Sequence, residues 1–134
     1  MLRLARERDS LQVIDDQYGA PTGGELLADV TAQALRSARK SPDLAGLYHV
    51  AAAGETTWCQ YARFVLTWAR ELGITLQVTP DRVGAITSAA YPTLARRPQN
   101  SRLNTNKLQQ TFDLRLPDWQ HGVVRMLSEV VEKQ

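Results

Sequence analysis

One helix limits what this chain can fold into more than any other feature. Thr57 and Gln60 have the spacing of a capping box, in which two side chains satisfy backbone N–H groups of a first helical turn. An apolar stripe at helical spacing then continues to a glycine, Gly73, that is typical of a helix end. The stripe consists of Tyr61, Phe64, Val65, Trp68 and Leu72. We expect a helix whose aromatic face packs into a core, because such stripes are core packing more often than ligand sites.

Other helices and strands are predicted around this one. Helical spacing predicts a short opening helix, a helix from Thr22 to Pro42, a short helix capped by Asn104 or Thr105, and a last helix with Pro117 in its first turn. The helix after Thr22 begins with a second capping-box pattern, Thr22 and Glu25. The predicted buried positions of this helix and the last one are Leu27, Val30, Ala34, Leu35, Ala38, Val123, Leu127, Val130 and Val131.

Three extended segments are predicted, at residues 11–14, 46–53 and 74–79, with an irregular stretch after Asp81. Residues 47–51 are almost entirely apolar, which is typical of a strand buried on both faces of a parallel sheet. Such a strand needs neighbours on both sides, and we expect an unpaired edge there because so few strands are visible. The alternation predicts one α/β domain, residues 1–134, that is mainly helical with a few short strands. The sequence also opens within a helical pattern that has no cap before it, so we expect a preceding segment.

Composition excludes several classes of function. The 16 basic and 14 acidic residues are mixed along the chain and give a net charge of +2, so no nucleic-acid-binding surface is indicated. The first residues alternate charged with apolar side chains, which fits neither a signal peptide nor a membrane span. A single cysteine, Cys59, excludes an internal disulfide and favours a reducing cytoplasm, and the two histidines give no zinc-ligand spacing.

An arginine-rich loop is the candidate binding site. Residues 91–105 contain Pro92 and Pro98, which stiffen the backbone and prevent a helix from crossing them. The loop carries cations suited to phosphate oxygens and polar side chains suited to a sugar or base: Arg96, Arg97, Asn100, Ser101, Arg102 and Asn104. The pattern indicates a phosphorylated small molecule as ligand. The alternative is that these arginines form surface ion pairs.

Catalytic motifs are missing from the sequence. None of the eight glycines belongs to a nucleotide-binding glycine pattern, and none of the four tyrosines has a lysine four residues later. His49 and His121 have no partner at a known motif spacing, and Cys59 fits an ordinary buried thiol. We therefore assign no catalytic residue.

Three stretches carry a resemblance to a known family. They are VIDDQYGAPTGGELLAD (residues 13–29), GLYHV (46–50) and AYPTLARRPQNSRLNT (90–105). With LPDW (116–119) in a matching place, the whole chain resembles the C-terminal part of dTDP-4-dehydrorhamnose reductases, which are extended short-chain dehydrogenase/reductases. Members of that family reduce dTDP-4-dehydro-L-rhamnose with NADPH or NADH and thereby supply dTDP-L-rhamnose for polysaccharide synthesis. Their cofactor turn and catalytic Tyr-x-x-x-Lys belong to an N-terminal Rossmann domain that has no counterpart here.

The resemblance implies a substrate-binding lobe of an extended Rossmann-type reductase. It places residues 96–104 beside the dTDP-sugar and lets Gln17 and Thr22 border the same cleft. It also implies that Glu25 and Glu129 hold a magnesium ion between two subunits of a homodimer, although both would equally fit a capping residue and a solvated helix residue. We expect the chain alone to bind no nicotinamide cofactor and to catalyse no hydride transfer. A non-enzymatic binding or regulatory subunit is the alternative.

Overall fold

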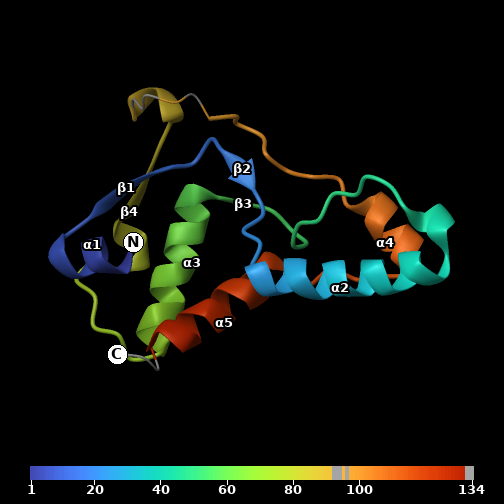
Figure 1. The fold of residues 1–134 in the computed structure, drawn as a ribbon. Helices are drawn as coiled ribbons and strands as arrows, with labels where there is room; N and C mark the ends of the chain where they lie inside the picture. Colours follow the sequence, from blue (N-terminus) through green and yellow to red (C-terminus); the bar gives the residue numbers. More distant parts are fainter. Residues whose placement is uncertain (92–94, 96, 132–134) are drawn as a thin grey trace.

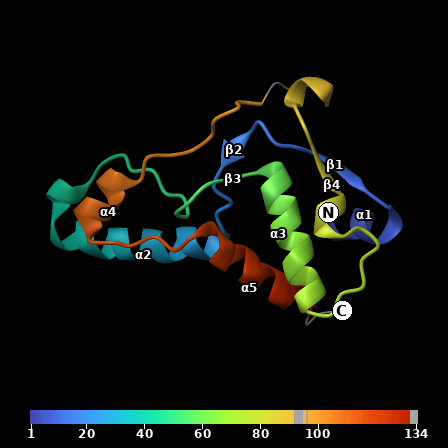
Figure 2. The same ribbon diagram turned by 180° about the vertical axis from the view of Figure 1, so that it is seen from behind.

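The computed structural model describes residues 1–91, 95 and 97–131, and its central element is α3 (Trp58–Glu71). On one side of α3 lie α1 (Leu2–Glu7), β1 (Leu11–Ile14) and β4 (Val83–Ile86) (Figure 1). Helix α5 (Trp119–Val131) crosses its lower end, and α2 (Gly24–Lys40) extends away with α4 (Asn106–Phe112) beside its far end. The reverse view in Figure 2 shows the same arrangement. The predicted class, a mainly helical α/β fold with few short strands, is confirmed.

The strands form two small pairs. β1 pairs with β4 in parallel, from Leu11 opposite Val83 to Ile14 opposite Ile86. β2 (Tyr18–Gly19) pairs in antiparallel fashion with β3 (Thr56–Thr57), immediately before α3 begins. The β2–β3 pair therefore brings the segment after β1 to the N-terminal end of α3. Short 3-10 helices complete the fold: η1 (Pro42–Leu44), η2 (Pro80–Arg82) and η3 (Ser88–Ala90).

Helix α3 is buried on two faces, more deeply than its aromatic stripe predicts. The stripe packs against α5, with Val65 beside Trp119, Val123 and Leu127, so the core interpretation is confirmed. The opposite face packs against α1, β1 and β4 through small and aliphatic residues that are each fully buried: Cys59, Ala62, Leu66 and Ala69. The predicted cap is also present, since the Thr57 hydroxyl accepts a hydrogen bond of 3.1 Å from the Gln60 N–H. Gly73 follows the helix at φ 82°, as predicted for its end.

The strand predicted at residues 46–53 is wrong. This segment is extended but pairs with no strand in the described part of the chain, and Leu47 near its start is 79% exposed. Ala51 and Ala52 are buried, Ala52 packs with Val65 of α3 and Trp119 of α5, and Ala53 makes an isolated bridge with Asp118. The apolar run therefore reflects burial without strand pairing, and the unpaired edge expected at residues 47–51 stays a prediction.

The strand predicted at residues 74–79 is also wrong, although Leu76 and Val78 are buried as its alternation requires. The N–H groups of Gln77 and Val78 both donate to the carbonyl of Ala5, so this segment docks on α1. The partner of β1 is instead β4, in the stretch expected to be irregular. Its Val-Gly-Ala-Ile sequence has too little alternation to indicate a strand.

The start of α2 differs from its predicted capping box. The N-cap is Gly23, which has no side chain to cap the helix. The Thr22 hydroxyl instead donates to the carbonyl of Ala20 (2.9 Å) and accepts from the Ala52 N–H (3.0 Å). Of the predicted buried positions in α2, Val30 is buried, but Leu27 and Leu35 are 41% and 60% exposed. The helix extends away from α3 and packs against α4 and η1, so much of its surface is left uncovered.

The last helix begins at Trp119, two residues after Pro117. It buries Val123 and Leu127 as predicted, whereas Val130 is 37% exposed and the side chain of Val131 lies outside the described residues. No helix in the described part of the chain is both long enough and apolar enough to span a membrane.

Candidate functional site

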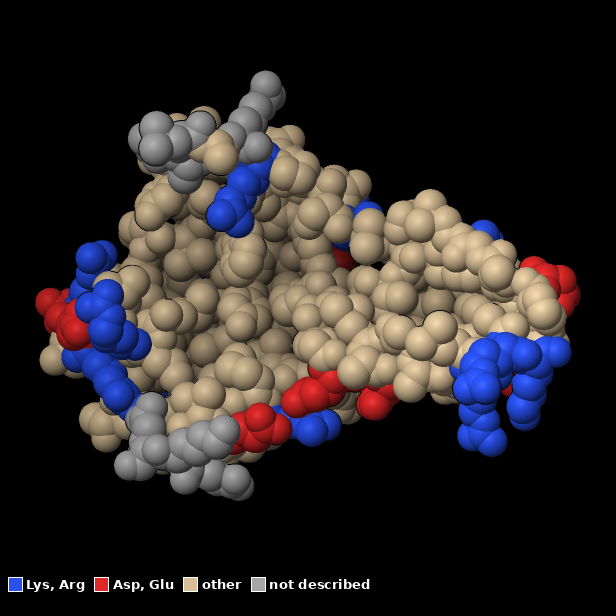
Figure 3. Space-filling view, in the orientation of Figure 1, with Lys and Arg blue, Asp and Glu red and all other residues tan. Residues whose placement is uncertain are grey.

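Two neighbouring cavities open beside the N-terminal end of α3. The first has a volume of about 900 Å³ and lies between β1, η3 and residues 97–99. The second, of about 560 Å³, lies between β2, β3 and the same loop. Four residues line both cavities: Gln17, Trp58, Arg97 and Pro98. Figure 3 shows the hollowed surface with Lys or Arg atoms at its upper margin.

The arginine loop reaches this site because it pairs with β2. The Tyr18 N–H donates to the carbonyl of Gln99 (2.7 Å), and the Ser101 N–H donates to the carbonyl of Tyr18 (2.9 Å). The Ser101 hydroxyl also donates to the Tyr18 carbonyl at 2.9 Å. This pairing sets residues 97–101 across the mouth of the cavities, more than 70 residues along the chain from β2.

The described arginines of the loop have different surroundings. Arg97 lines both cavities, and none of the ion pairs formed among the described residues includes it. Arg102 instead pairs with Glu55, donates to the Asn100 side chain at 2.9 Å, and lies over the Tyr18 ring at 5.5 Å. Arg102 thus forms the surface ion pair that was the alternative for this loop, whereas the guanidinium of Arg97 faces the cavities without a carboxylate partner among the described residues. Arg96 lies outside the described residues.

The polar side chains predicted for the site also fall into two groups, those that line a cavity and those that bond within the chain. Gln17 is 9% exposed and faces both cavities, and Thr22 and Ser101 line the second. Asn100 accepts from Arg102, and the Asn104 side chain accepts from the Asn106 N–H (2.9 Å) at the start of α4. Neither asparagine is among the residues that line the cavities, and the side chains of both accept hydrogen bonds from groups of the chain itself, so their contact with a ligand stays a prediction.

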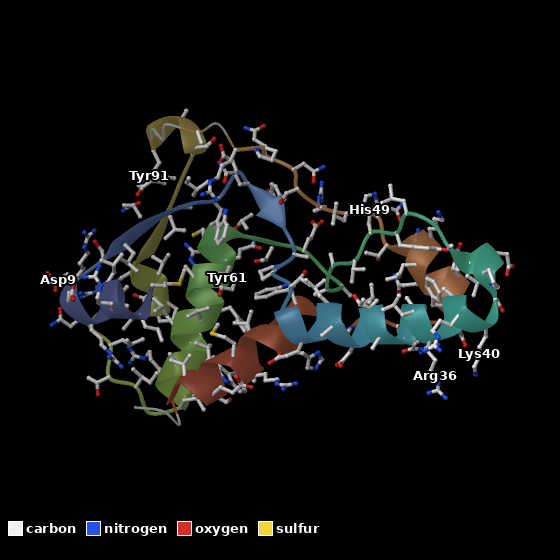
Figure 4. The ribbon with its side chains drawn as sticks, in the orientation of Figure 1. Asp9, Arg36, Lys40, His49, Tyr61 and Tyr91 are labelled. Atoms are coloured by element: carbon white, nitrogen blue, oxygen red, sulfur yellow. The ribbon has the colours of Figure 1, made fainter. Side chains whose placement is uncertain are left out.

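Aromatic residues of the site were not predicted. Trp58, the first residue of α3, is 46% exposed and lines both cavities, while Tyr91 lines the first and Tyr61 the second. Figure 4 shows Tyr91 next to η3 and Tyr61 on α3. Burial raises the pKa of the Tyr61 phenol, so it stays a protonated hydroxyl at neutral pH. The position of Trp58 directly after an N-cap was the one available signal, because a first-turn aromatic outside the helical stripe has no core partner to explain it.

Two further reactive side chains, Cys59 and His49, lie outside the two cavities. Cys59 is fully buried, and burial raises the pKa of its thiol, as expected for a structural cysteine. His49 lies on the connection between α2 and β3, far from Tyr61 and Tyr91 (Figure 4). Neither residue lines the two cavities.

Glu25 and Glu129 do come together, but around a cation of the chain itself. Arg125 lies 3.5 Å from the Glu25 carboxylate and 3.2 Å from that of Glu129, where α2 and α5 meet. These carboxylates raise the pKa of the Arg125 guanidinium. No group of three His, Cys, Asp or Glu side chains suited to a metal occurs within the described residues. Two carboxylates that share a guanidinium do not fit a divalent cation without further ligands.

Together, the fold and the double cavity define a ligand-binding portion of an α/β protein. The chain belongs to the family described as the RmlD substrate binding domain, whose model matches residues 1–132. It is 60% identical over 130 residues to dTDP-4-dehydrorhamnose reductase of Escherichia coli (strain K12), covering 97% of this chain and 43% of that protein. A reductase of the same name from Sinorhizobium fredii is 39% identical over 132 residues, covering 95% of this chain and 42% of that one.

Solved structures agree. The fold matches dTDP-4-dehydrorhamnose reductase of Bacillus anthracis, solved in complex with NADP, with a TM-score of 0.78 and 27% identity over 95% of this chain and 41% of that one. The structure of a dTDP-4-dehydrorhamnose reductase from Clostridium acetobutylicum matches with a TM-score of 0.76 and 25% identity, covering 96% of this chain and 41% of that one. The resemblance drawn from the sequence is therefore confirmed. The chain spans less than half the length of these relatives.

Proposed function

We propose that the chain binds the dTDP-sugar substrate of a dTDP-4-dehydrorhamnose reductase in the double cavity. Arg97 carries the proposal, because it lines both cavities and has no ion-pair partner among the described residues. A guanidinium in that place suits a diphosphate that joins a base on one side to a sugar on the other. Gln17, Thr22 and Ser101 add neutral hydrogen-bonding groups around it.

Titration of the chain with dTDP tests this directly. Arg97→Ala should weaken binding by about ten- to a hundredfold, because a hydrogen bond to a charged group contributes roughly 1.5 to 3 kcal/mol. Arg39→Ala, which removes the same charge from the far end of α2, is the control and should leave affinity unchanged. Equal affinity for dTDP in the Arg97 variant and the wild type would disprove the assigned contact.

The complete reaction, reduction of the 4-keto group with NADPH or NADH, is proposed for a protein that also has the cofactor-binding half. The chain itself is expected to leave NADPH unoxidised when mixed with dTDP-4-dehydrorhamnose, because hydride transfer needs a seated nicotinamide and a proton donor at the carbonyl oxygen. Loss of NADPH absorbance with the chain alone would contradict this. Recovery of activity on adding a separately produced N-terminal half would support it.

A magnesium-bridged homodimer stays a prediction. It would require Glu25 and Glu129 to exchange Arg125 for an ion that prefers about six oxygen ligands, several of them from a second copy or from water. Sedimentation with magnesium and then with a chelator distinguishes the cases. An unchanged mass would exclude the bridge, whereas a mass that doubles only with magnesium would support it.

A further inference from the structure

One aromatic side chain lies where the two cavities meet. Trp58, the first residue of α3, lines both cavities and is 46% exposed. The other two tryptophans belong to the core, since Trp119 is 6% exposed and Trp68 packs against the same apolar cluster. A single exposed aromatic on a flat surface needs no explanation, whereas one that lines two cavities presents its ring to whatever occupies them.

The indole of Trp58 is held in place by its neighbours on α3. Thr57, directly before it, caps the helix at Gln60 and donates to the Asp15 carboxylate, which fixes the backbone at this point. One turn later, the ring of Tyr61 contacts the indole, with centroids 6.1 Å apart and planes at 90°. An aromatic side chain that is already ordered loses little conformational freedom when a ligand covers it.

Two polar groups without partners lie around the same two cavities. Arg97 lines both and forms no ion pair among the described residues. Gln17 also lines both, and although it is only 9% exposed, its side-chain amide takes part in none of the hydrogen bonds formed among the described residues. A flat apolar ring, a cation and an amide with both a donor and an acceptor therefore converge on one space. They match the planar face of a nucleobase, a diphosphate and the polar groups of a nucleotide.

A protein surface is the other kind of group that could cover Trp58, because the chain spans less than half the length of its relatives. The depth of Gln17 favours a small molecule instead. Its amide is nine-tenths buried, so a partner has to enter the cavities to reach it. A buried amide that is left without a hydrogen bond is costly, and a nucleotide that enters beside Trp58 removes that cost.

We propose that Trp58 is the platform on which the planar base of the bound nucleotide stacks, next to the diphosphate at Arg97. This inference rests on the proposed function and deepens it, because it assigns a second part of the same ligand. Stacking on an aromatic ring is tolerant of the base, so Trp58 adds affinity for a base without distinguishing one base from another.

Titrations with dTDP and with inorganic pyrophosphate separate the two contacts, because only dTDP carries a base. Trp58→Leu should weaken dTDP binding by about ten- to a hundredfold, the usual effect of losing one base stack, and should leave pyrophosphate binding unchanged. Arg97→Ala should weaken the binding of both probes. Trp58→Phe keeps an aromatic face and is the matched control, so its affinity for dTDP should stay within about threefold of the wild type.

Tryptophan fluorescence gives a second readout, because a base stacked on an indole quenches its emission. Saturating dTDP should quench the fluorescence of the wild-type chain, and saturating pyrophosphate should not. Trp58→Phe retains the two core tryptophans, Trp68 and Trp119, and should bind dTDP without this quenching.

The outcomes distinguish the platform from the proposed function. If Trp58→Leu binds dTDP as tightly as Trp58→Phe does, or loses affinity for dTDP and pyrophosphate equally, no base stacks on Trp58 and the platform is wrong, while a loss of dTDP binding in Arg97→Ala would still support the proposed function. If the wild-type chain does not bind dTDP, both proposals fail. If the urea unfolding curve shows that Trp58→Leu does not fold, the fluorescence of Trp58→Phe decides, and quenching that persists there would overturn the platform.

Discussion

Helix α3 borders the cavities with its N-terminal end, and residues 88–91 and 97–101, which we call the cavity segment, border them from another side. The two regions are held by different forces. The buried faces of α3 contact two apolar clusters, and its residues Cys59, Ala62, Leu66 and Ala69 are completely inaccessible to solvent. The cavity segment contributes no residue to the buried core in its described part, and polar bonds to Asp16 and Tyr18 hold it in place. A helix packed into the core thus contributes Trp58 and Tyr61 to the cavity walls, and a hydrogen-bonded segment contributes residues such as Tyr91 and Arg97.

Because the two regions are held by different forces, substitutions in α3 should mainly affect stability, and substitutions in the cavity segment should mainly affect binding. Apolar burial contributes most of the free energy of folding, so changes in α3 should mainly alter stability. The hydrogen bonds of the cavity segment each contribute about 0.5 to 1.5 kcal/mol, less than a buried core side chain, and they hold Ser88, Gln99 and Ser101 against Asp16 and Tyr18. Substitutions in the two regions should therefore have opposite profiles of stability and affinity.

The largest effect is expected at the centre of α3. Leu66→Ala should lower the free energy of unfolding by about 2 to 5 kcal/mol, because Leu66 is fully buried and a cavity would remain. Leu35→Ala is the same substitution at a residue of α2 that is 60% exposed, and it should change stability by no more than about 0.5 kcal/mol. Urea unfolding measures both. Similar losses in the two variants would contradict the placement of the core.

Thr57 joins the two regions and should give the next largest effect. Its hydroxyl caps α3 at Gln60 and donates to Asp15, and the residue is 2% exposed. Thr57→Ala should cost about 1 to 2 kcal/mol of unfolding free energy, which is the usual range for a lost N-cap. Thr67→Ala on the exposed face of the same helix is the control, and its effect should stay within about 0.5 kcal/mol. If the two threonines prove equivalent in urea unfolding, Thr57 does not stabilise the start of α3.

How far the sequence predicts the structure differs between these regions for a physical reason. The extent of α3 follows from its cap, its 3.6-residue periodicity and Gly73, all of which are local signals. Residues 46–53 and 74–79 were predicted as strands because burial gives an extended segment the same apolar pattern whether or not a neighbour pairs with it. The pairing of β1 with β4 depends on residues about 70 positions apart, and no local pattern encodes it.

The same limit applies to the site. Gln17, Thr22, Arg97 and Ser101 were predicted and do line a cavity, since their residue types and the family resemblance both indicate binding. The tie between Asp16 and Ser88 joins residues 72 positions apart, and an Asp-Asp pair after a strand reads simply as a turn. Trp58 and Tyr91 became part of the site only when tertiary structure brought β2, α3 and η3 together.

Acidic pH should loosen the cavity segment before it affects α3. The pKa of Asp16 is lowered in the folded chain, chiefly by the Ser88 N–H, so its stabilising effect is complete above its ordinary pKa of 3.8 and is lost as the pH falls through the lower folded value. The difference in stability between wild type and Asp16→Asn should therefore be constant at neutral pH and shrink below about pH 4. Urea unfolding of both proteins from pH 7 to pH 3 measures it. A difference that persists unchanged at pH 3 would show that the carboxylate charge is irrelevant.

The smallest effect is expected for the ion pair between Arg102 and Glu55, which ties the end of the arginine loop to the turn before β3. Their side chains are 45% and 53% exposed, and exposed pairs contribute only about 0.2 to 1 kcal/mol. A double-mutant cycle with Arg102→Ala and Glu55→Ala should give a coupling energy in that range, and it should fall further as salt is raised from low concentration to about 1 M. Because Arg102 already has partners within the chain, its loss should weaken dTDP binding less than the loss of Arg97. If Arg102→Ala abolished dTDP binding while Arg97→Ala did not, the roles assigned to the two arginines would have to be exchanged. Arg102 would then be the residue that contacts the ligand, and Arg97 would not.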